Sequence, residues 1–154
     1  MRNRWRSVGV LAGALFAVNV VARLVTRFAF DEDPVAADRV SLAMFLVIGA
    51  VLATVTFRWA RRSAVARWGG DLATAVGIAM LATVLVGPLL VGNNPFAGGG
   101  VTFFAQLGLY LLATGAGVLT GYLIATALGV DHQSQLLKRY AEVKSAKPRR
   151  PARH

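Results

Sequence analysis

The sequence predicts an all-α integral membrane protein, a bundle of four transmembrane helices, and three observations support this class. First, 56% of the 154 residues are hydrophobic, compared with about 45–50% in a typical soluble domain. Second, apolar residues gather in four spans, each about as long as a helix that crosses a ~30 Å hydrocarbon core. Third, fourteen of the seventeen Lys and Arg residues lie on one side of these spans.

The basic residues also predict the orientation. They cluster in residues 2–6, 58–67 and 138–153, and short loops rich in Lys and Arg stay in the cytoplasm. Both termini are therefore predicted to be cytoplasmic, in a multi-pass protein of a bacterial inner (cell) membrane. Tryptophan prefers the headgroup level of a membrane, and all three tryptophans lie within the basic clusters, so they mark the same inner interface. The predicted inner-interface anchors are Trp5, Arg6, Arg58, Trp59, Arg61, Arg62, Arg67 and Trp68.

The chain divides into nine predicted segments. In order they are the N-terminus (1–6), the first span (7–30), an acidic outer loop (31–39), the second span (40–57), a basic cytoplasmic loop (58–71), the third span (72–91), a Gly/Asn-rich outer loop (92–100), the fourth span (101–130) and a basic tail (131–154). Pro34 and the turn residues of the second outer loop interrupt the apolar runs. Because both outer loops are short, the spans are predicted to form two antiparallel hairpins.

The first span has one alternative, a cleaved signal peptide. Arg2 to Arg6 would form its basic region and residues 8–21 its apolar region, with Val20-Val21-Ala22 as the cleavage site. Apolar character resumes at Leu24 and continues to Phe30, which favours a full transmembrane span.

The second, third and fourth spans differ in length and regularity. The second has eighteen residues and is predicted to stand nearly upright, whereas the fourth has about thirty and is predicted to tilt or to project. In the third, Gly87-Pro88 predicts either a kink or the end of the helix, because proline removes a helical hydrogen bond.

Small residues at four-residue spacing predict the helix-packing faces, because packing rather than hydrophobicity drives helix association in lipid. The predicted packing residues are Gly9 and Gly13 in the first span and Gly117, Gly121 and Ala125 in the fourth, with Gly129 in the same register. Gln106, Tyr110 and Thr114 share this arc of the fourth span. The main interpretation is packing within the bundle, and homodimerisation through the fourth span is the alternative.

A polar stripe, Asn19, Arg23 and Arg27, follows one face of the first span. A rise of about 1.5 Å per residue puts Arg23 roughly 6 Å inside the outer boundary. An ionisable residue within the bilayer is a functional-site hypothesis. The stripe therefore predicts an anion or lipid-headgroup site of Asn19, Arg23, Arg27, Gln106 and Tyr110, provided that the first and fourth spans touch. The alternative is that both arginines snorkel outward and pair with Asp31, Glu32, Asp33 or Asp38.

The tail begins with Asp131, a predicted N-cap for a short amphipathic helix over residues 132–146 that lies on the inner leaflet. The residues that follow are too polar and Pro-rich to fold alone. The predicted lipid or partner contacts are Leu136, Lys138, Arg139, Tyr140, Val143, Arg149 and Arg150. The tail serves either as an electrostatic topology anchor or as a docking segment.

Catalytic signals are missing from the sequence. It has no cysteine and two histidines, His132 and His154, and it carries no nucleophile-elbow, zinc-protease or P-loop pattern. We therefore expect no enzyme activity, no cofactor, no metal and no nucleic-acid partner. The predicted function is a small accessory, scaffold or assembly subunit that acts through helix packing and its basic tail. Its predicted partners are anionic inner-leaflet lipids and a membrane protein or a second copy of itself. The alternative is a small oligomeric channel, transporter or lipid-translocation component that uses the stripe around Arg23.

Overall fold

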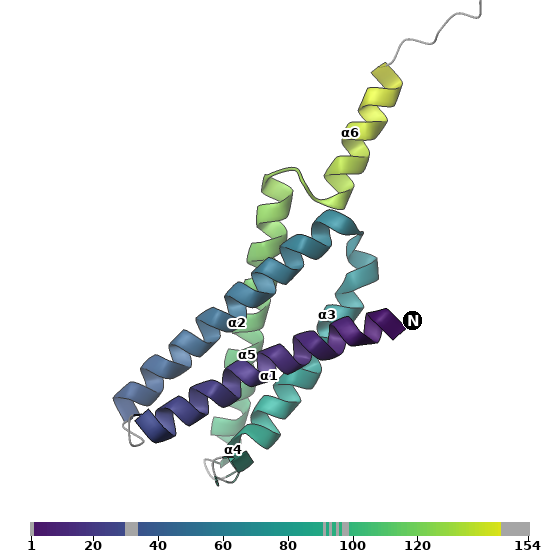
Figure 1. The fold of residues 1–154 in the computed structure, drawn as a ribbon. Helices are drawn as coiled ribbons and strands as arrows, with labels where there is room; N and C mark the ends of the chain where they lie inside the picture. The colour runs from purple at the N-terminus through teal and green to yellow at the C-terminus, as the bar shows by residue number, and fades with distance from the viewer. Residues whose placement is uncertain are drawn as a thin grey trace, which may run out of the picture.

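The computed structural model describes residues 2–29, 34–90, 92, 94, 96 and 99–145, and within these ranges the regular structure is helical, with no strand (Figure 1). Four stretches are long and apolar enough to cross a membrane: Trp5–Ala29, Val35–Arg62, Val65–Leu90 and Gly99–Ser145. The predicted all-α class is thus confirmed for the described residues, and so are four helical stretches of a length and composition that suit a membrane span.

The helices are longer than the apolar spans. In chain order they are α1 (Arg2–Ala29), α2 (Pro34–Arg62), α3 (Val65–Leu81), the π-helical turn η1 (Ala82–Val86), α4 (Gly87–Leu90), α5 (Gly99–Ala127) and α6 (His132–Ser145). Helix α2 starts inside the predicted acidic loop, because proline is well tolerated at the first helical position. Only Ser63 and Ala64 separate α2 from α3, so most of the predicted basic loop is helix.

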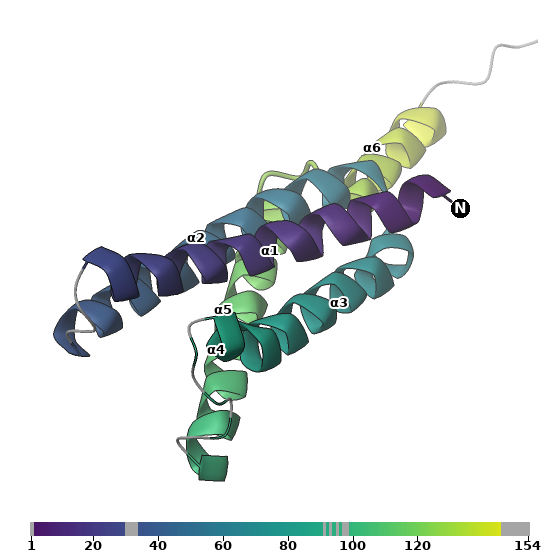
Figure 2. The ribbon, with the colours of Figure 1, turned by 60° about the horizontal axis from the view of Figure 1, so that its bottom comes forward.

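One of the two predicted hairpin pairs is packed and the other is not: α1 contacts α2, as predicted, but α3 and α5 hardly touch. Helix α5 packs mainly along α2, and α3 packs mainly along α1, while α3 and α5 touch over a short stretch only (Figure 2). The expectation that the third and fourth spans form a packed hairpin is therefore wrong. The physical reason lies in the small residues of α5, because Gly117 and Gly121 let its backbone approach that of α2.

The α2–α5 seam is a backbone-to-backbone contact. A Cβ atom added at Gly117 would lie 2.6 Å from the carbonyl oxygen of Gly49, and one added at Gly121 would clash with the carbonyl of Ala53. Gly117, Gly121 and Ala125 are all buried in this seam. The predicted packing face of the fourth span is thus occupied within the chain, which leaves no room on it for a second copy.

The predicted packing face of the first span is corrected. Gly9 and Gly13 are exposed, and a Cβ atom added at either would meet no atom within 4 Å. Helix α1 instead turns its larger side chains, Val8, Leu11 and Leu15, into the core. Large apolar residues bury more surface than glycine does, so they decide which side of α1 faces the bundle.

The tryptophans divide into two groups. Trp5 is exposed, as a headgroup anchor would be, and so are the side chains of the predicted anchors Arg6, Arg58, Arg61, Arg62 and Arg67. Trp68, however, is buried, and its ring lies 6.4 Å from that of the half-buried Trp59. Trp68 therefore joins the core between α2 and α3 and is not an exposed anchor.

The connection from α5 to α6 is fixed by local hydrogen bonds. Gly129 adopts a left-handed conformation with φ +61°, so it ends the helix rather than continuing the packing face. Gln135 Nε2 donates to the carbonyl of Val130 at 2.6 Å, and Lys138 Nζ donates to that of Gly129 at 3.1 Å. These bonds hold the start of α6 against the turn.

Asp131 is the N-cap of α6, as predicted. Its Oδ2 atom accepts hydrogen bonds from the backbone N–H groups of Gln133 at 3.1 Å and Ser134 at 3.2 Å. The Ser134 side chain, followed by these backbone bonds, holds the pKa of Asp131 below its usual value. The carboxylate therefore stays ionised and capping at neutral pH.

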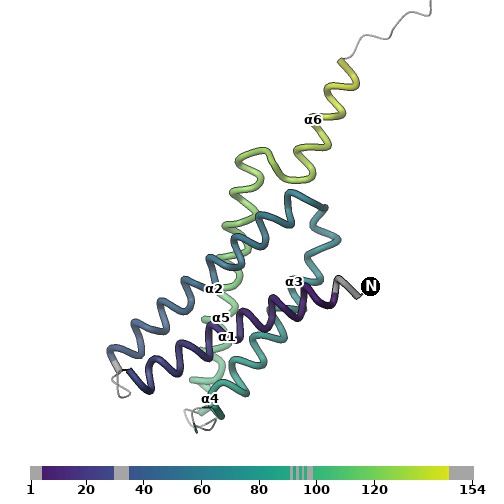
Figure 3. The backbone as a smooth tube through the Cα atoms, viewed as in Figure 1, coloured from purple at the N-terminus to yellow at the C-terminus, as the bar shows by residue number. Residues whose placement is uncertain are grey.

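Helix α6 projects beyond the bundle (Figure 3). Its apolar side chains Leu136, Tyr140 and Val143 are exposed, as is Arg139. Lys138, predicted to contact lipid or a partner, closes the turn to Gly129 instead. Arg149 and Arg150 lie outside the described residues, so the predicted contacts of the distal tail stay predictions.

Candidate functional site

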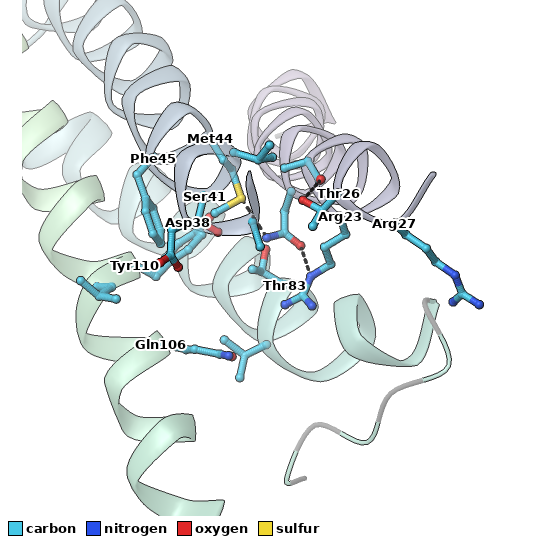
Figure 4. Close-up of a pocket in the computed structure, with 16 residues that line it drawn as sticks. Arg23, Thr26, Arg27, Asp38, Ser41, Met44, Phe45, Thr83, Gln106 and Tyr110 are labelled. Atoms are coloured by element: carbon cyan, nitrogen blue, oxygen red, sulfur yellow. Dashed lines mark hydrogen bonds between the residues drawn. The ribbon is translucent and has the colours of Figure 1, made fainter. Parts of the chain in front are cut away.

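The polar stripe of α1 runs from the core to the end of the helix. Asn19 is 3% exposed, Arg23 is half-buried and Arg27 is exposed. Their four-residue spacing keeps all three on one face of α1. In Figure 4, Arg27 extends away from the other labelled residues, whereas Arg23 points toward the third span.

Asn19 holds the Arg23 side chain in place. Its Oδ1 atom accepts a hydrogen bond from Arg23 Nε at 3.1 Å, and its Nδ2 atom donates to the sulfur of Met44 at 3.1 Å (Figure 4). Within the described ranges of the chain, the bond to Asn19 is the only hydrogen bond of this guanidinium. An arginine has five N–H donors in a planar fork. Four of them are therefore free to meet a ligand.

Gly87 makes room for this pair. A Cβ atom at position 87 would lie 2.9 Å from Arg23 Nε and 3.0 Å from Asn19 Oδ1. Gly87 also closes η1, since its N–H donates to the carbonyl of Ala82, five residues earlier. Pro88 has no N–H to continue the pattern. The Gly87-Pro88 dipeptide thus sits at a π-helical turn, a feature often found at functional sites.

The kink predicted at this dipeptide has a definite form. The irregularity is the π turn over Ala82–Val86, and helix continues beyond it as α4. The helix nevertheless ends at Leu90, two residues beyond Pro88, so the dipeptide also lies near a helix end, as the alternative predicted. Pro88 has no N–H group and cannot donate a hydrogen bond to the preceding turn. The N–H group of Gly87 is bonded to the carbonyl of Ala82, five residues earlier, so the π turn keeps Gly87 hydrogen-bonded.

All five predicted site residues line one cavity of about 460 Å³, here called the polar cavity. Helices α1 and α5 do not pack along each other, because α2 and η1 lie between them. Their polar residues meet across the cavity instead. The polar side chains around it are Asn19, Arg23, Thr26 and Arg27 from α1, Asp38 and Ser41 from α2, Thr83 from η1, and Gln106 and Tyr110 from α5.

Two hydroxyl groups at the polar cavity are buried without a hydrogen-bond partner. Tyr110 is 1% exposed and Thr83 is 5% exposed, and neither hydroxyl oxygen has a hydrogen-bond partner among the described residues. Thr83 lies beside the Tyr110 hydroxyl, but no hydrogen bond of acceptable geometry joins them. An unsatisfied buried hydroxyl costs about 1–3 kcal/mol. A ligand that bonds to both would recover this cost.

The sequence did not identify every residue of the polar cavity. Thr83 and Ser41 went unnoticed, because a single threonine or serine in an apolar span is ordinary. Gly87 was considered only for the kink, and its closeness to Arg23 was not predicted. Asp38 was predicted only as a partner for the arginines, and no ion pair joins it to Arg23 in the described part of the chain. The other predicted carboxylates, Asp31, Glu32 and Asp33, lie outside the described residues.

A second polar hollow, of about 600 Å³, lies at the other end of the bundle. Arg62 and Arg67 line it together with Trp59 and Trp68. These are four of the predicted interface anchors, and the hollow brings them together around the α2–α3 connection.

Residues that would bind a metal are not grouped in the described part of the chain, where no three His, Cys, Asp or Glu side chains come together. A comparison of the whole chain with protein-family models, with curated proteins and with solved structures finds no match. Function is therefore inferred from the polar cavity and from the exposed surfaces.

Proposed function

We propose that this protein binds the phosphate-bearing headgroup of a membrane lipid in the polar cavity, as a small lipid-handling or lipid-translocation component. The observation that carries the proposal is the convergence of Asn19, Arg23, Gln106 and Tyr110 on that one cavity. With both termini in the cytoplasm, the proposed orientation puts the cavity in the outer half of the membrane.

The electrostatics of Arg23 favour an anionic ligand. A guanidinium inside an apolar span costs several kcal/mol unless it is paired or solvated. Asn19 is neutral, so it orients the charge without neutralising it. The free N–H groups of the guanidinium form a fork that matches two oxygens of a phosphate group. The unpartnered hydroxyls of Tyr110 and Thr83 supply two further donors.

The walls of the polar cavity favour a lipid as the source of that phosphate. Phe45, Val84 and Leu109 lie among the polar residues that line it. A mixed lining of this kind suits the junction between a headgroup and its acyl chains. A soluble anion would gain nothing from the apolar part of the wall.

Replacing Arg23 by Gln tests the proposal. The full-length protein is titrated in detergent with a phospholipid of defined chain length, and the bound fraction is measured by native mass spectrometry. We expect Arg23→Gln to weaken binding by more than about tenfold, because it removes a charge that faces the ligand inside a span. Arg39→Gln is the matched control, because Arg39 is exposed on α2 and does not itself line the cavity. Equal binding by the two variants would refute the proposal.

A second candidate function, an accessory subunit that docks through α6, is supported by a separate observation. Leu136, Tyr140 and Val143 remain exposed on α6, and the α5–α6 turn carries three side-chain hydrogen-bonding groups that direct the helix away from the bundle. The apolar face of α6 is thus available to a partner or to the inner leaflet.

Partner capture from native membranes tests the docking role. Under this role a membrane protein copurifies at a fixed stoichiometry, and Tyr140→Glu weakens that association, whereas Glu142→Gln on the same helix does not. A wild-type protein that purifies alone and monodisperse would contradict it.

A further inference from the structure

We infer that the polar cavity selects a zwitterionic headgroup of the phosphoethanolamine type, whose phosphate meets Arg23 and whose primary ammonium meets Asp38. This inference rests on the proposed function and adds the chemical class of the ligand. The inference is based on the position of Asp38. Its carboxylate lines the polar cavity, and a site for phosphate alone does not explain it.

Asp38 and Arg23 face the same cavity from different helices. Asp38 comes from α2 and Arg23 from α1, and Figure 4 shows the two side chains on separate walls. No ion pair joins them, and Asp38 makes no hydrogen bond to any other side chain within the described ranges. Two opposite charges are thus held apart by a space that could accommodate a headgroup.

A carboxylate at this position disfavours a purely anionic ligand. Two like charges about 4 Å apart repel each other by roughly 1–4 kcal/mol, depending on how much water surrounds them. A ligand with an ammonium group reverses the sign of that interaction at Asp38 and keeps the attraction at Arg23. The cavity therefore discriminates between headgroups of equal phosphate chemistry but different net charge.

The hydrogen-bonding groups near Asp38 favour a primary ammonium over a methylated one. A primary ammonium donates three hydrogen bonds. Asp38 and Ser41 lie three residues apart on α2, so they share a helix face, and Gln106 lines the cavity from α5. All three can accept a hydrogen bond. A trimethylammonium group has no N–H to donate and would leave these acceptors unsatisfied.

The test compares three lipids with identical acyl chains: phosphatidylethanolamine, phosphatidylglycerol and phosphatidylcholine. Each is titrated into the full-length protein in detergent and measured by native mass spectrometry. We expect phosphatidylethanolamine to bind about fivefold more tightly than the other two, the effect of one partly exposed ion pair. Asp38→Asn should abolish this preference, because it weakens ethanolamine binding and, by removing the repulsion of an anionic headgroup, leaves glycerol binding equal or tighter. Glu142→Gln, which removes a carboxylate from α6 far from the cavity, should change neither.

The outcomes separate the two proposals. Equal binding of all three lipids to the wild type, or an unchanged preference in Asp38→Asn, overturns the zwitterion inference and leaves headgroup binding intact. If the wild type binds none of the three lipids more tightly than the Arg23→Gln variant does, the proposed function itself is overturned. Soluble glycerophosphoethanolamine, added as a competitor, separates the sources. If it displaces the lipid at equal concentration, the ligand chemistry stands but its source is a soluble phosphodiester.

Discussion

The same face of α5 forms two very different environments. Near Gly117 and Gly121 it presses against the backbone of α2 and leaves no space. Near Gln106 and Tyr110, two to three turns away, it borders a cavity of about 460 Å³ that contains unpartnered hydroxyls. Both regions belong to one helix and face the same side. Residue size decides which environment forms, because glycine lets two backbones touch and tyrosine holds them apart.

One part of α5 is thus closely packed against α2, and another part borders a polar cavity. The α2–α5 seam satisfies its backbone polar groups inside the helices and excludes solvent and lipid. The polar cavity keeps a guanidinium and two hydroxyls incompletely paired, which costs stability unless a ligand is bound. The close contact between α2 and α5 thus stabilises a bundle that also contains the polar cavity.

The largest expected effect comes from filling the seam. We expect Gly121→Ala to lower the free energy of unfolding by about 2 kcal/mol or more, because the new methyl group would overlap the Ala53 backbone. Gly108→Ala is the control, because that site on α5 has open space. It should be neutral or stabilising by up to about 1 kcal/mol from helix propensity. Tryptophan fluorescence during denaturation in detergent measures both, and a stable Gly121→Ala variant would mean that α2 does not cover this face.

A methyl group added beside the polar cavity, at Gly87, should weaken ligand binding. We expect Gly87→Ala to weaken headgroup binding by about tenfold, equal to roughly 1.4 kcal/mol, since the added Cβ atom displaces Arg23 Nε and Asn19 Oδ1. Gly77→Ala, in the same transmembrane segment with nothing within 4 Å, should bind as the wild type does. Native mass spectrometry compares the two, and equal affinities would remove Gly87 from the site.

A smaller effect, of opposite sign for stability and binding, is expected at Tyr110. Its hydroxyl is buried and has no hydrogen-bond partner in the described part of the chain, so Tyr110→Phe should leave the unfolding free energy unchanged or raise it by up to about 1 kcal/mol. Lipid binding should weaken in the same variant, because a donor to the phosphate is lost. Tyr122→Phe, on α5 but outside the polar cavity, should leave binding unchanged. A loss of stability in Tyr110→Phe would show that the hydroxyl is already satisfied.

The smallest effect is expected on the open side of α1. Gly13 has nothing within 4 Å, so Gly13→Leu should change the unfolding free energy by no more than about 0.5 kcal/mol. The oligomeric state, measured by size-exclusion chromatography with light scattering, should also stay the same. A shift in either quantity would mean that Gly9 and Gly13 pack against another copy after all.

Much of the fold was predictable because lipid imposes strong local rules. A span must be apolar and about 20 residues long, so all four spans were located before any contact was known. The cap at Asp131 and the packing role of Gly117, Gly121 and Ala125 were predicted for similar reasons, since each depends on residues close in the sequence. The sequence also predicted a site of Asn19, Arg23, Gln106 and Tyr110, because these polar residues stand out in apolar surroundings, and the structure places all four around one cavity.

Other features depended on which helix lies beside which. The sequence by itself determined the four apolar spans, the polar stripe of the first and the close-packing face of the fourth, but not the packing face of the first. Only the tertiary structure decided that α2, and not α3, covers the small face of α5, and that Gly87 lies under Arg23. The physical reason is that lipid tails are as apolar as the helices, so hydrophobicity cannot choose between partners. That choice depends on the detailed fit of surfaces far apart in the sequence, and the same fit leaves the polar cavity open.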